Sequence, residues 1–232
     1  MQRLADLRRF YALMDELARR TGGPRLLAAC SGRMAWPQRG VYFFTEPGEV
    51  RQGSGEGPRI VRVGTHALKG GSRTTLWTRL SQHKGQHASG GGNHRGSIFR
   101  LLVGAALLAD DPALCATWGQ GSNAARTIRE AERELEGRVS GVIGQMPFLF
   151  LPIDDAPGPQ SLRGFIERNA IALLSNSWKT PLDAASTGWL GLRCPRERVR
   201  QSHLWNQNHV DENYDPAFLG MLEVLVCRLR KL

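Results

Sequence analysis

Three side chains in the first half of the chain have the chemistry to bind an anion and to move a proton. Arg79 and His83 are four residues apart, so on a helix they share one face, one turn from each other. The planar guanidinium of Arg79 suits a phosphate group, and the imidazole of His83 titrates near neutral pH. Tyr42 adds a phenol within an apolar run that precedes them. These groups define a candidate site if the fold brings them together.

Two strands and a helix are expected to position these residues. Residues 40–44 and 60–65 are apolar runs bounded by turn-forming residues, which is typical of strands. Residues 46–58 between them are rich in glycine and proline, so we expect a long hairpin loop there. Residues 76–83 repeat leucine at helical spacing and therefore predict the helix that carries Arg79.

The order of these motifs resembles that of the GIY-YIG nuclease superfamily. The residues that carry the resemblance are, in chain order, Gly40, Val41, Tyr42, Val63, Gly64, Arg79 and His83. Each motif is short, so the resemblance rests on their order. Arg62 departs from the pattern, because the second motif of this family usually has a tyrosine at that position. Arg62 can contact a phosphate but cannot supply the missing hydroxyl.

The resemblance implies an α+β fold with a small, three-stranded, mostly antiparallel sheet flanked by helices. A third strand is expected at residues 146–153, followed by a helix at residues 164–174 that bears Glu167. We expect one elaborated domain over residues 1–232. Its parts would be a nuclease core at 38–180, a helical insertion at about 97–140, and flanking helices at 1–23 and 215–232.

The resemblance also implies roles for individual residues. Glu167 would hold a single divalent cation, Mg²⁺ or Mn²⁺, since such ions accept one carboxylate and otherwise keep water and phosphate ligands. Arg79 would hold the scissile phosphate. Tyr42 would orient or deprotonate the attacking water, and His83 would share or take over that role. Asn176, after the glutamate helix, is the nearest match to an asparagine that fixes local geometry in the family.

The positive charge of the chain is concentrated in its first 100 residues. The net charge is +10. Residues 1–100 contain seventeen Lys and Arg against six Asp and Glu, whereas residues 101–232 contain fourteen against fifteen. A basic half favours binding to a polyphosphate through release of counterions. An inert basic surface has the same composition, so charge alone leaves both interpretations open.

A glycine-rich stretch at residues 84–97 follows the predicted helix. It lacks the spacing of a nucleotide-binding P-loop. Lys84, His87 and Arg95 are its candidate nucleic-acid-binding residues. The stretch is expected to act either as a flap over nucleic acid or as an ordinary linker.

A charged segment at residues 124–139 is expected to form one largely exposed helix. Its glutamates alternate with arginines, and they are Glu130, Glu132, Glu134 and Glu136. This alternation predicts a solvated helix face and not a cluster of metal ligands.

Two further segments have both a structural and a nucleic-acid-binding interpretation. Residues 3–20 predict an amphipathic helix that either lays its basic side on a phosphate backbone or covers the core. Residues 202–212 contain asparagines and histidines that could read base edges. Asx-turn chemistry explains the same composition, and we favour it.

These features predict a metal-dependent endonuclease that hydrolyses phosphodiester bonds, with DNA as the expected substrate and restriction or a mobile element as the expected context. One alternative is a catalytically impaired nucleic-acid-binding protein on the same scaffold, and another is an interaction protein whose basic half contacts an acidic partner. No apolar run is long enough to span a membrane, and the first residues do not resemble a secretory signal. Four scattered cysteines predict reduced thiols. We therefore expect a cytoplasmic protein with no membrane partner.

Overall fold

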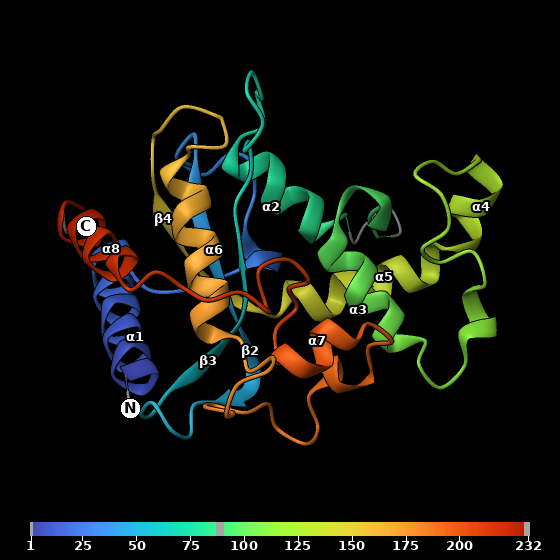
Figure 1. Ribbon diagram of the computed structural model, residues 1–232. Helices are drawn as coiled ribbons and strands as arrows, with labels where there is room; N and C mark the ends of the chain where they lie inside the picture. The colour runs from blue at the N-terminus through green and yellow to red at the C-terminus, as the bar shows by residue number, and fades with distance from the viewer. Residues whose placement is uncertain (1, 87–90, 230–232) are drawn as a thin grey trace.

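The protein folds around one open antiparallel sheet. The computed structural model describes residues 2–86 and 91–229 (Figure 1). The sheet has four strands in the order β1-β4-β2-β3. The strands are β1 Arg25–Leu26, β2 Gly40–Val50, β3 Pro58–Gly64 and β4 Pro147–Pro152. The predicted α+β class is confirmed, and the three predicted strands are joined by the two-residue strand β1.

Helices cover both faces of the sheet. They are α1 Gln2–Thr21, α2 Leu76–Lys84, α3 Ile98–Leu107, α4 Arg126–Ala131, α5 Arg133–Gly144, α6 Leu162–Leu174, α7 Glu197–Ser202 and α8 Ala217–Cys227. One apolar cluster joins α1, α6 and α8 to the sheet, and a second joins α2, α3 and α5 to it. Figure 1 shows the first group on the left and the second towards the right, with α4 farthest out. No described helix combines the length and apolar character that crossing a membrane requires.

Alternation along β2 assigns its side chains to the two faces. Val41 and Phe43 belong to the cluster with α1, whereas Tyr42 and Phe44 belong to the cluster with α2. In the antiparallel register Tyr42 lies opposite Gly64 of β3. The register therefore places the phenol of the first motif against the glycine of the second.

Strand β2 extends beyond the predicted boundary. Residues 46–50 belong to the strand, so the loop predicted from residue 46 is wrong at its start. Register shifts after Phe44 and Thr45 accommodate the irregular sequence, as bulges do in antiparallel pairs. Glu49 is buried in an ion pair with Arg59 at 2.5 Å, which holds this end of β2 against β3.

The charged segment at residues 124–139 was predicted to be one exposed helix, and that prediction is wrong. It forms two helices, α4 and α5, which meet at Glu132. Glu130 and Glu134 are exposed, but Glu132 and Glu136 are only 1% and 3% exposed. Both buried carboxylates are paired with arginines from the stretch that precedes α3 or from α3 itself.

The helix α1 covers the core, as the structural interpretation predicts. Its residues Leu7, Phe10 and Leu17 are buried. Arg20 donates hydrogen bonds to the backbone carbonyls of residues 227 and 229, and Arg9 pairs with Glu223 of α8. These basic side chains therefore connect the two ends of the chain.

The close approach of Tyr42 to Gly64 leads to a stability prediction. A Cβ placed on Gly64 would overlap the Tyr42 hydroxyl and ring. We expect Gly64→Ala to lower the free energy of unfolding by roughly 1–3 kcal/mol, the usual cost of overpacking. Gly70→Ala is the matched control, because a Cβ there meets no atom within 4 Å. Urea unfolding of both variants measures the difference, and equal stabilities would contradict the proposed contact.

Candidate active site

The carboxylate of Glu167 lies at the end of β3. Glu167 is on α6, and its Oε1 accepts a hydrogen bond from the Thr65 backbone N–H at 3.0 Å. Thr65 follows Gly64 directly, so this bond joins the glutamate helix to the second motif. Burial raises the pKa of the Glu167 carboxyl, and the positive charge of Arg62 is the main effect opposing it. Glu167 is thus a half-buried acid held beside the strand end by one backbone bond.

The phenol of Tyr42 and the imidazole of His83 form a buried pair. The Tyr42 hydroxyl and His83 Nε2 are 2.8 Å apart, and neither residue is exposed to solvent. The other ring nitrogen, Nδ1, is 2.7 Å from the Ser97 hydroxyl. Burial, followed by the charges of Arg62, Arg79 and Arg100, holds the pKa of His83 well below its usual value. The neutral ring therefore donates one of its two hydrogen bonds and accepts the other.

Arg62 connects these two parts of the site. Its guanidinium donates to the Trp205 carbonyl and lies 4.7 Å above the Phe99 ring. Burial lowers the pKa of Arg62, while Tyr42 and Glu167 raise it, the former also through a hydrogen bond. Arg62 is 5% exposed. It therefore sits between the phenol and the carboxylate as an internal cation and not as a surface contact.

Arg79 lies on the more open side of α2. Its Nη1 donates to the Gly96 carbonyl and to Gln82 Oε1, both at 3.2 Å. Its Nε is buried and has no hydrogen-bond partner among the described residues. Arg79 also contributes to the electrostatic environment of Glu167 and of His83. Arg79 as a whole is half-buried, and its unpaired Nε donor is covered by surrounding atoms.

The environment of Glu167 fits a divalent cation. Oε1 is occupied by the Thr65 N–H, whereas Oε2 accepts no hydrogen bond from the part of the chain that the structure describes. A free carboxylate oxygen is the donor that Mg²⁺ and Mn²⁺ prefer. Within residues 2–86 and 91–229, no three His, Cys, Asp or Glu side chains form a metal-binding group. A cation here would therefore rely on few protein ligands, with water and substrate supplying the rest.

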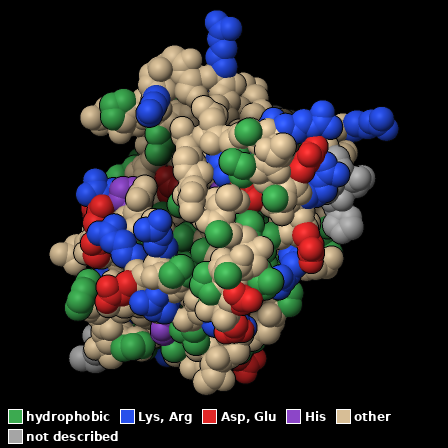
Figure 2. Space-filling view, turned by 90° about the vertical axis from the view of Figure 1, so that its right-hand side faces the viewer, with side chains coloured by type: hydrophobic (Ala, Val, Ile, Leu, Met, Phe, Trp, Pro, Cys, Tyr) green, Lys and Arg blue, Asp and Glu red, His purple; other side chains and the backbone are tan. Residues whose placement is uncertain are grey.

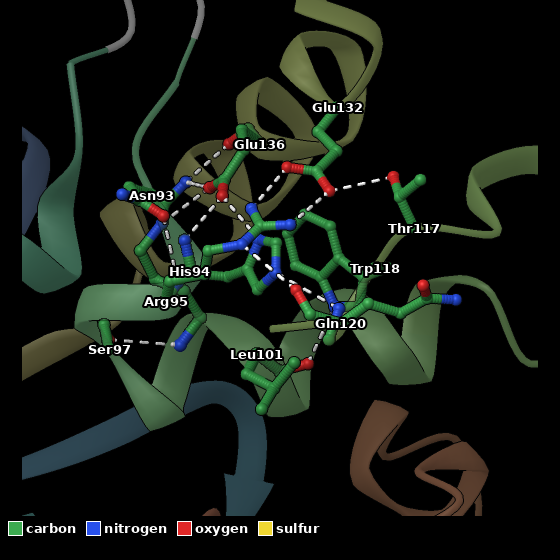
Figure 3. A network of polar contacts seen from close by, with 12 residues as sticks. Asn93, His94, Arg95, Ser97, Leu101, Thr117, Trp118, Gln120, Glu132 and Glu136 are labelled. Carbon is green, nitrogen blue, oxygen red and sulfur yellow. Dashed lines mark hydrogen bonds and ion pairs between the residues drawn. The ribbon is translucent and has the colours of Figure 1, made fainter. Parts of the chain in front are cut away.

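A buried polar network supports the α2 side of the site (Figure 3). Arg100 pairs with Glu136 at 2.5 Å and also donates to the His83 carbonyl at 2.9 Å. Glu136 accepts from the backbone N–H and Nδ1 of His94 at 2.6 and 3.0 Å. His94 Nε2 accepts from the Gly119 N–H, and its ring stacks on Trp118 at 3.9 Å. Glu136 and Gly119 thereby fix the segment that supplies Ser97 and Gly96 to the site.

Comparison with known proteins identifies the family. The family model of the GIY-YIG domain matches residues 1–232. The chain belongs to the GIY-YIG family. Members of this family are nucleases. Neither the curated proteins nor the solved structures contain a significant match to the chain.

The GIY-YIG motif residues come together, but Asn176 does not join them. Asn176 is buried, and its Oδ1 accepts from Arg3 and from the Leu182 N–H, both at 2.9 Å. Its Nδ2 is 3.3 Å from His203 Nδ1. Asn176 thus fixes the chain after α6, and its hydrogen bonds reach none of the other predicted site residues in the described structure.

Two of the three predicted nucleic-acid contacts have other partners, and the third lies outside the described residues. Arg95 is not available for a phosphate, because its guanidinium makes a bidentate pair with Glu132 at 2.6 and 2.8 Å and is 4% exposed. Lys84 is half-buried and donates to the Cys30 carbonyl. His87 falls in the segment that the structure does not describe.

Asn206, Ser97 and Arg100 support the candidate site but were not predicted to do so. Asn206 Oδ1 accepts from the Val63 N–H at 3.1 Å, and its Nδ2 donates to the Val63 carbonyl at 2.8 Å. This contact favours the structural interpretation of residues 202–212 over base reading. Ser97 carried a signal, since a serine before an apolar helical run is a preferred N-cap. No local pattern indicated the partner of Asn206, which is 143 residues away.

An open groove of about 1190 Å³ runs along the outer side of α2. Its lining includes Trp77, Gln82, Lys84, Asn93 and Gly96. The Gly96 carbonyl also accepts a hydrogen bond from Arg79, so Gly96 belongs both to the groove and to the candidate site. On the face seen in Figure 2, Lys and Arg side chains are interspersed with Asp and Glu. The groove therefore meets the candidate site at Gly96, whereas Arg79 is not among the described residues that line it.

The Arg100–Glu136 pair leads to a second prediction. Arg100→Met would leave the Glu136 carboxylate buried without its cation, which typically costs about 3–5 kcal/mol. Arg126→Met is the matched control, because Arg126 pairs with Glu130 on α4 with both side chains substantially exposed. We expect the control to change stability by roughly 0.5 kcal/mol or less. Thermal unfolding followed by circular dichroism measures both, and similar losses would contradict the assigned role.

Buried neutral histidines predict loss of stability in acid. Burial and the neighbouring Arg163 lower the pKa of His66 to about 4. As pH falls below about 6.5, this histidine is protonated in the unfolded chain before it is protonated in the folded protein, so acid favours unfolding. Between pH 7 and pH 5, His66 alone should reduce the free energy of unfolding by about 2 kcal/mol. Urea unfolding at both pH values should show a smaller loss for His66→Gln, and an identical loss would exclude this contribution.

Proposed function

We propose that this protein is a metal-dependent endonuclease that hydrolyses phosphodiester bonds in DNA. The observation that carries the proposal is the position of Glu167. Its carboxylate is bonded to Thr65 at the end of the second motif and lies within electrostatic reach of Arg62 and Arg79. This arrangement combines a cation-binding carboxylate with a phosphate-binding guanidinium on a nuclease-family scaffold.

Glu167 and Arg79 would perform different parts of the hydrolysis. Glu167 would hold the divalent cation, Mg²⁺ or Mn²⁺, which supplies charge stabilisation to the phosphate when bound. Arg79 would bind the nonbridging phosphate oxygens through its planar guanidinium. Substrate would approach along the groove next to Gly96, because the carbonyl of this lining residue accepts a hydrogen bond from Arg79.

Tyr42 and His83 would orient or deprotonate the attacking water. The neutral imidazole is able to accept a hydrogen bond from the phenol across their 2.8 Å contact, and Ser97 holds the second ring nitrogen. The guanidinium of Arg62 lies beside the phenol, within hydrogen-bonding reach of its hydroxyl. Because both side chains are fully covered, substrate binding has to admit the reacting water to this pair.

The second candidate is a nucleic-acid-binding protein that does not turn over its ligand. It is favoured by Arg62, which occupies the usual tyrosine position and whose guanidinium is committed to the Trp205 carbonyl and to Phe99. In this alternative the groove and Arg79 would still bind a polyphosphate, but no hydroxyl would replace the missing one.

Cleavage assays on two variants test the proposed activity. We expect Glu167→Gln and Arg79→Ala to reduce the initial rate of Mg²⁺- or Mn²⁺-dependent plasmid nicking by at least about 100-fold, because each removes a group that stabilises the transition state. Arg129→Ala, on the exposed face of α4, is the control and should keep full activity. Glutamine preserves the acceptor for Thr65 and removes a desolvated charge. The Glu167→Gln protein should therefore gain roughly 0.5–2 kcal/mol of stability.

The same assays separate the two candidate functions. Full activity of the stable Glu167→Gln protein would exclude the proposed metal site. DNA binding that depends on Arg79, without cleavage by the unmodified protein across metals and substrates, would establish the second candidate instead.

A further inference from the structure

The loop that joins β3 to α2, residues 65–75, begins and ends at the candidate site. Its first residue, Thr65, donates its backbone N–H to Glu167 Oε1 at 3.0 Å. Its last residue, Thr75, is the N-cap of α2, and the Thr75 carbonyl accepts from the Arg79 N–H at 3.1 Å. The β3–α2 loop therefore connects the proposed cation-binding carboxylate to the proposed phosphate-binding guanidinium.

The base of the β3–α2 loop is fixed by a buried arginine of α6. Arg163 is fully buried, donates to the His66 carbonyl and pairs with Asp155. The Thr65 hydroxyl donates to the Gly40 carbonyl at 2.8 Å. Buried hydrogen-bonded networks of this kind rigidify the chain that they hold. The base of the loop is therefore held against α6 and β2, beside the Glu167 carboxylate.

The tip of the β3–α2 loop, residues 69–73, projects from the molecule. Figure 1 shows it in teal at the top of the view, beside α2, and Figure 2 shows a basic side chain standing out at the same end. The Ser72 N–H donates to the Lys69 carbonyl at 3.2 Å and closes a turn. A Cβ on Gly70 or Gly71 would meet no atom within 4 Å. The tip is thus a narrow turn with open space around its glycines.

Lys69 and Arg73, on either side of the two glycines, are cations without a partner. Both side chains are exposed, and neither makes a hydrogen bond or an ion pair with a described residue. Residues 57–109 contain eight Lys and Arg and no Asp or Glu. The other six all donate to acceptors within the protein, and they are Arg59, Arg62, Arg79, Lys84, Arg95 and Arg100. The two tip residues are therefore the cations of this stretch that remain for an external anion.

We propose that the tip of the β3–α2 loop binds backbone phosphates of a DNA duplex beside the scissile phosphate. This inference rests on the proposed function and adds a second phosphate-binding site to it. Lys69 and Arg73 supply the charge, and the two glycines allow the backbone to approach the duplex closely. A duplex is stiff and densely charged, so it suits a rigidly based site better than a flexible single strand does. Such contacts fix the position of the substrate without reading its sequence.

Fluorescence anisotropy of a labelled DNA duplex tests this site, in EDTA to prevent metal-dependent cleavage and at several salt concentrations. We expect the double variant Lys69→Gln/Arg73→Gln to bind the duplex at least about fivefold more weakly at roughly 0.1 M salt. The slope of log affinity against log salt concentration should fall by about 2, one for each cation removed. In cleavage assays its KM should rise while kcat changes little, because a remote phosphate contact is the same in the ground and transition states.

The double variant Arg129→Gln/Arg133→Gln is the matched control. It also removes two exposed cations that have no partner within the described residues, from α4 and the first turn of α5. It should bind and cleave DNA like the unmodified protein. Both double variants should keep the unfolding temperature, since they change only unpaired surface side chains. Equal losses of affinity in the two double variants would reduce the effect to overall charge and overturn the assignment.

Three further outcomes separate the loop site from the proposed nuclease activity. If the Lys69→Gln/Arg73→Gln protein binds and cleaves like the unmodified protein while Glu167→Gln loses cleavage, the loop site is overturned and the nuclease stands. If the loop variant loses duplex binding but the unmodified protein cleaves nothing, the loop site stands and the nuclease fails. An equal loss on a single strand of the same length, or no duplex binding by the unmodified protein in EDTA, would overturn the duplex site whatever the cleavage assay shows.

Discussion

The ion pair between Arg100 and Glu136 holds together the region on which the candidate site depends. It lies in a low-dielectric interior, where a fully satisfied polar network is rigid and a broken one is costly. Arg100 extends the pair to the His83 carbonyl, and Glu136 extends it to His94. These contacts therefore join the helices α2, α3 and α5 to the segment before α3, and together they support the candidate site. Through these contacts α3 and α5 help to orient His83 and Arg79 on α2.

The site itself has an interior side and an open side. Tyr42 and His83 form the interior side, where burial keeps the imidazole neutral. Glu167 and Arg79 are half-buried and form the more open side, where Glu167 Oε2 accepts no hydrogen bond from the described residues. Arg62 lies between them, and its charge acts on both the phenol and the carboxylate. Arg62 therefore links the buried Tyr42–His83 pair to the Glu167 carboxylate at the end of β3.

Periodicity and motif order predicted the strands β2, β3 and β4, the helices α2 and α6, and the meeting of their motif residues. These two signals failed where the role of a side chain depends on a partner that lies far away in the sequence. The alternation around Glu132 and Glu136 indicates a solvated helix, because local sequence carries no sign of arginines 37 and 36 residues earlier. For the same reason Arg95 was assigned to nucleic acid although its guanidinium is enclosed. The sequence around Asn206 likewise gave no indication of its role, since that role depends on Val63 of β3, 143 residues earlier.

The way residues Trp205 and Asn206 meet β3 also affects the behaviour of the protein in solution. As the last strand of an open sheet, β3 has one side that could pair with a strand of another molecule. Trp205 occupies the Val61 carbonyl, and Asn206 occupies both backbone groups of Val63. These groups are consequently withheld from intermolecular strand addition. The segment that supports the site thus also protects the sheet against edge-to-edge aggregation.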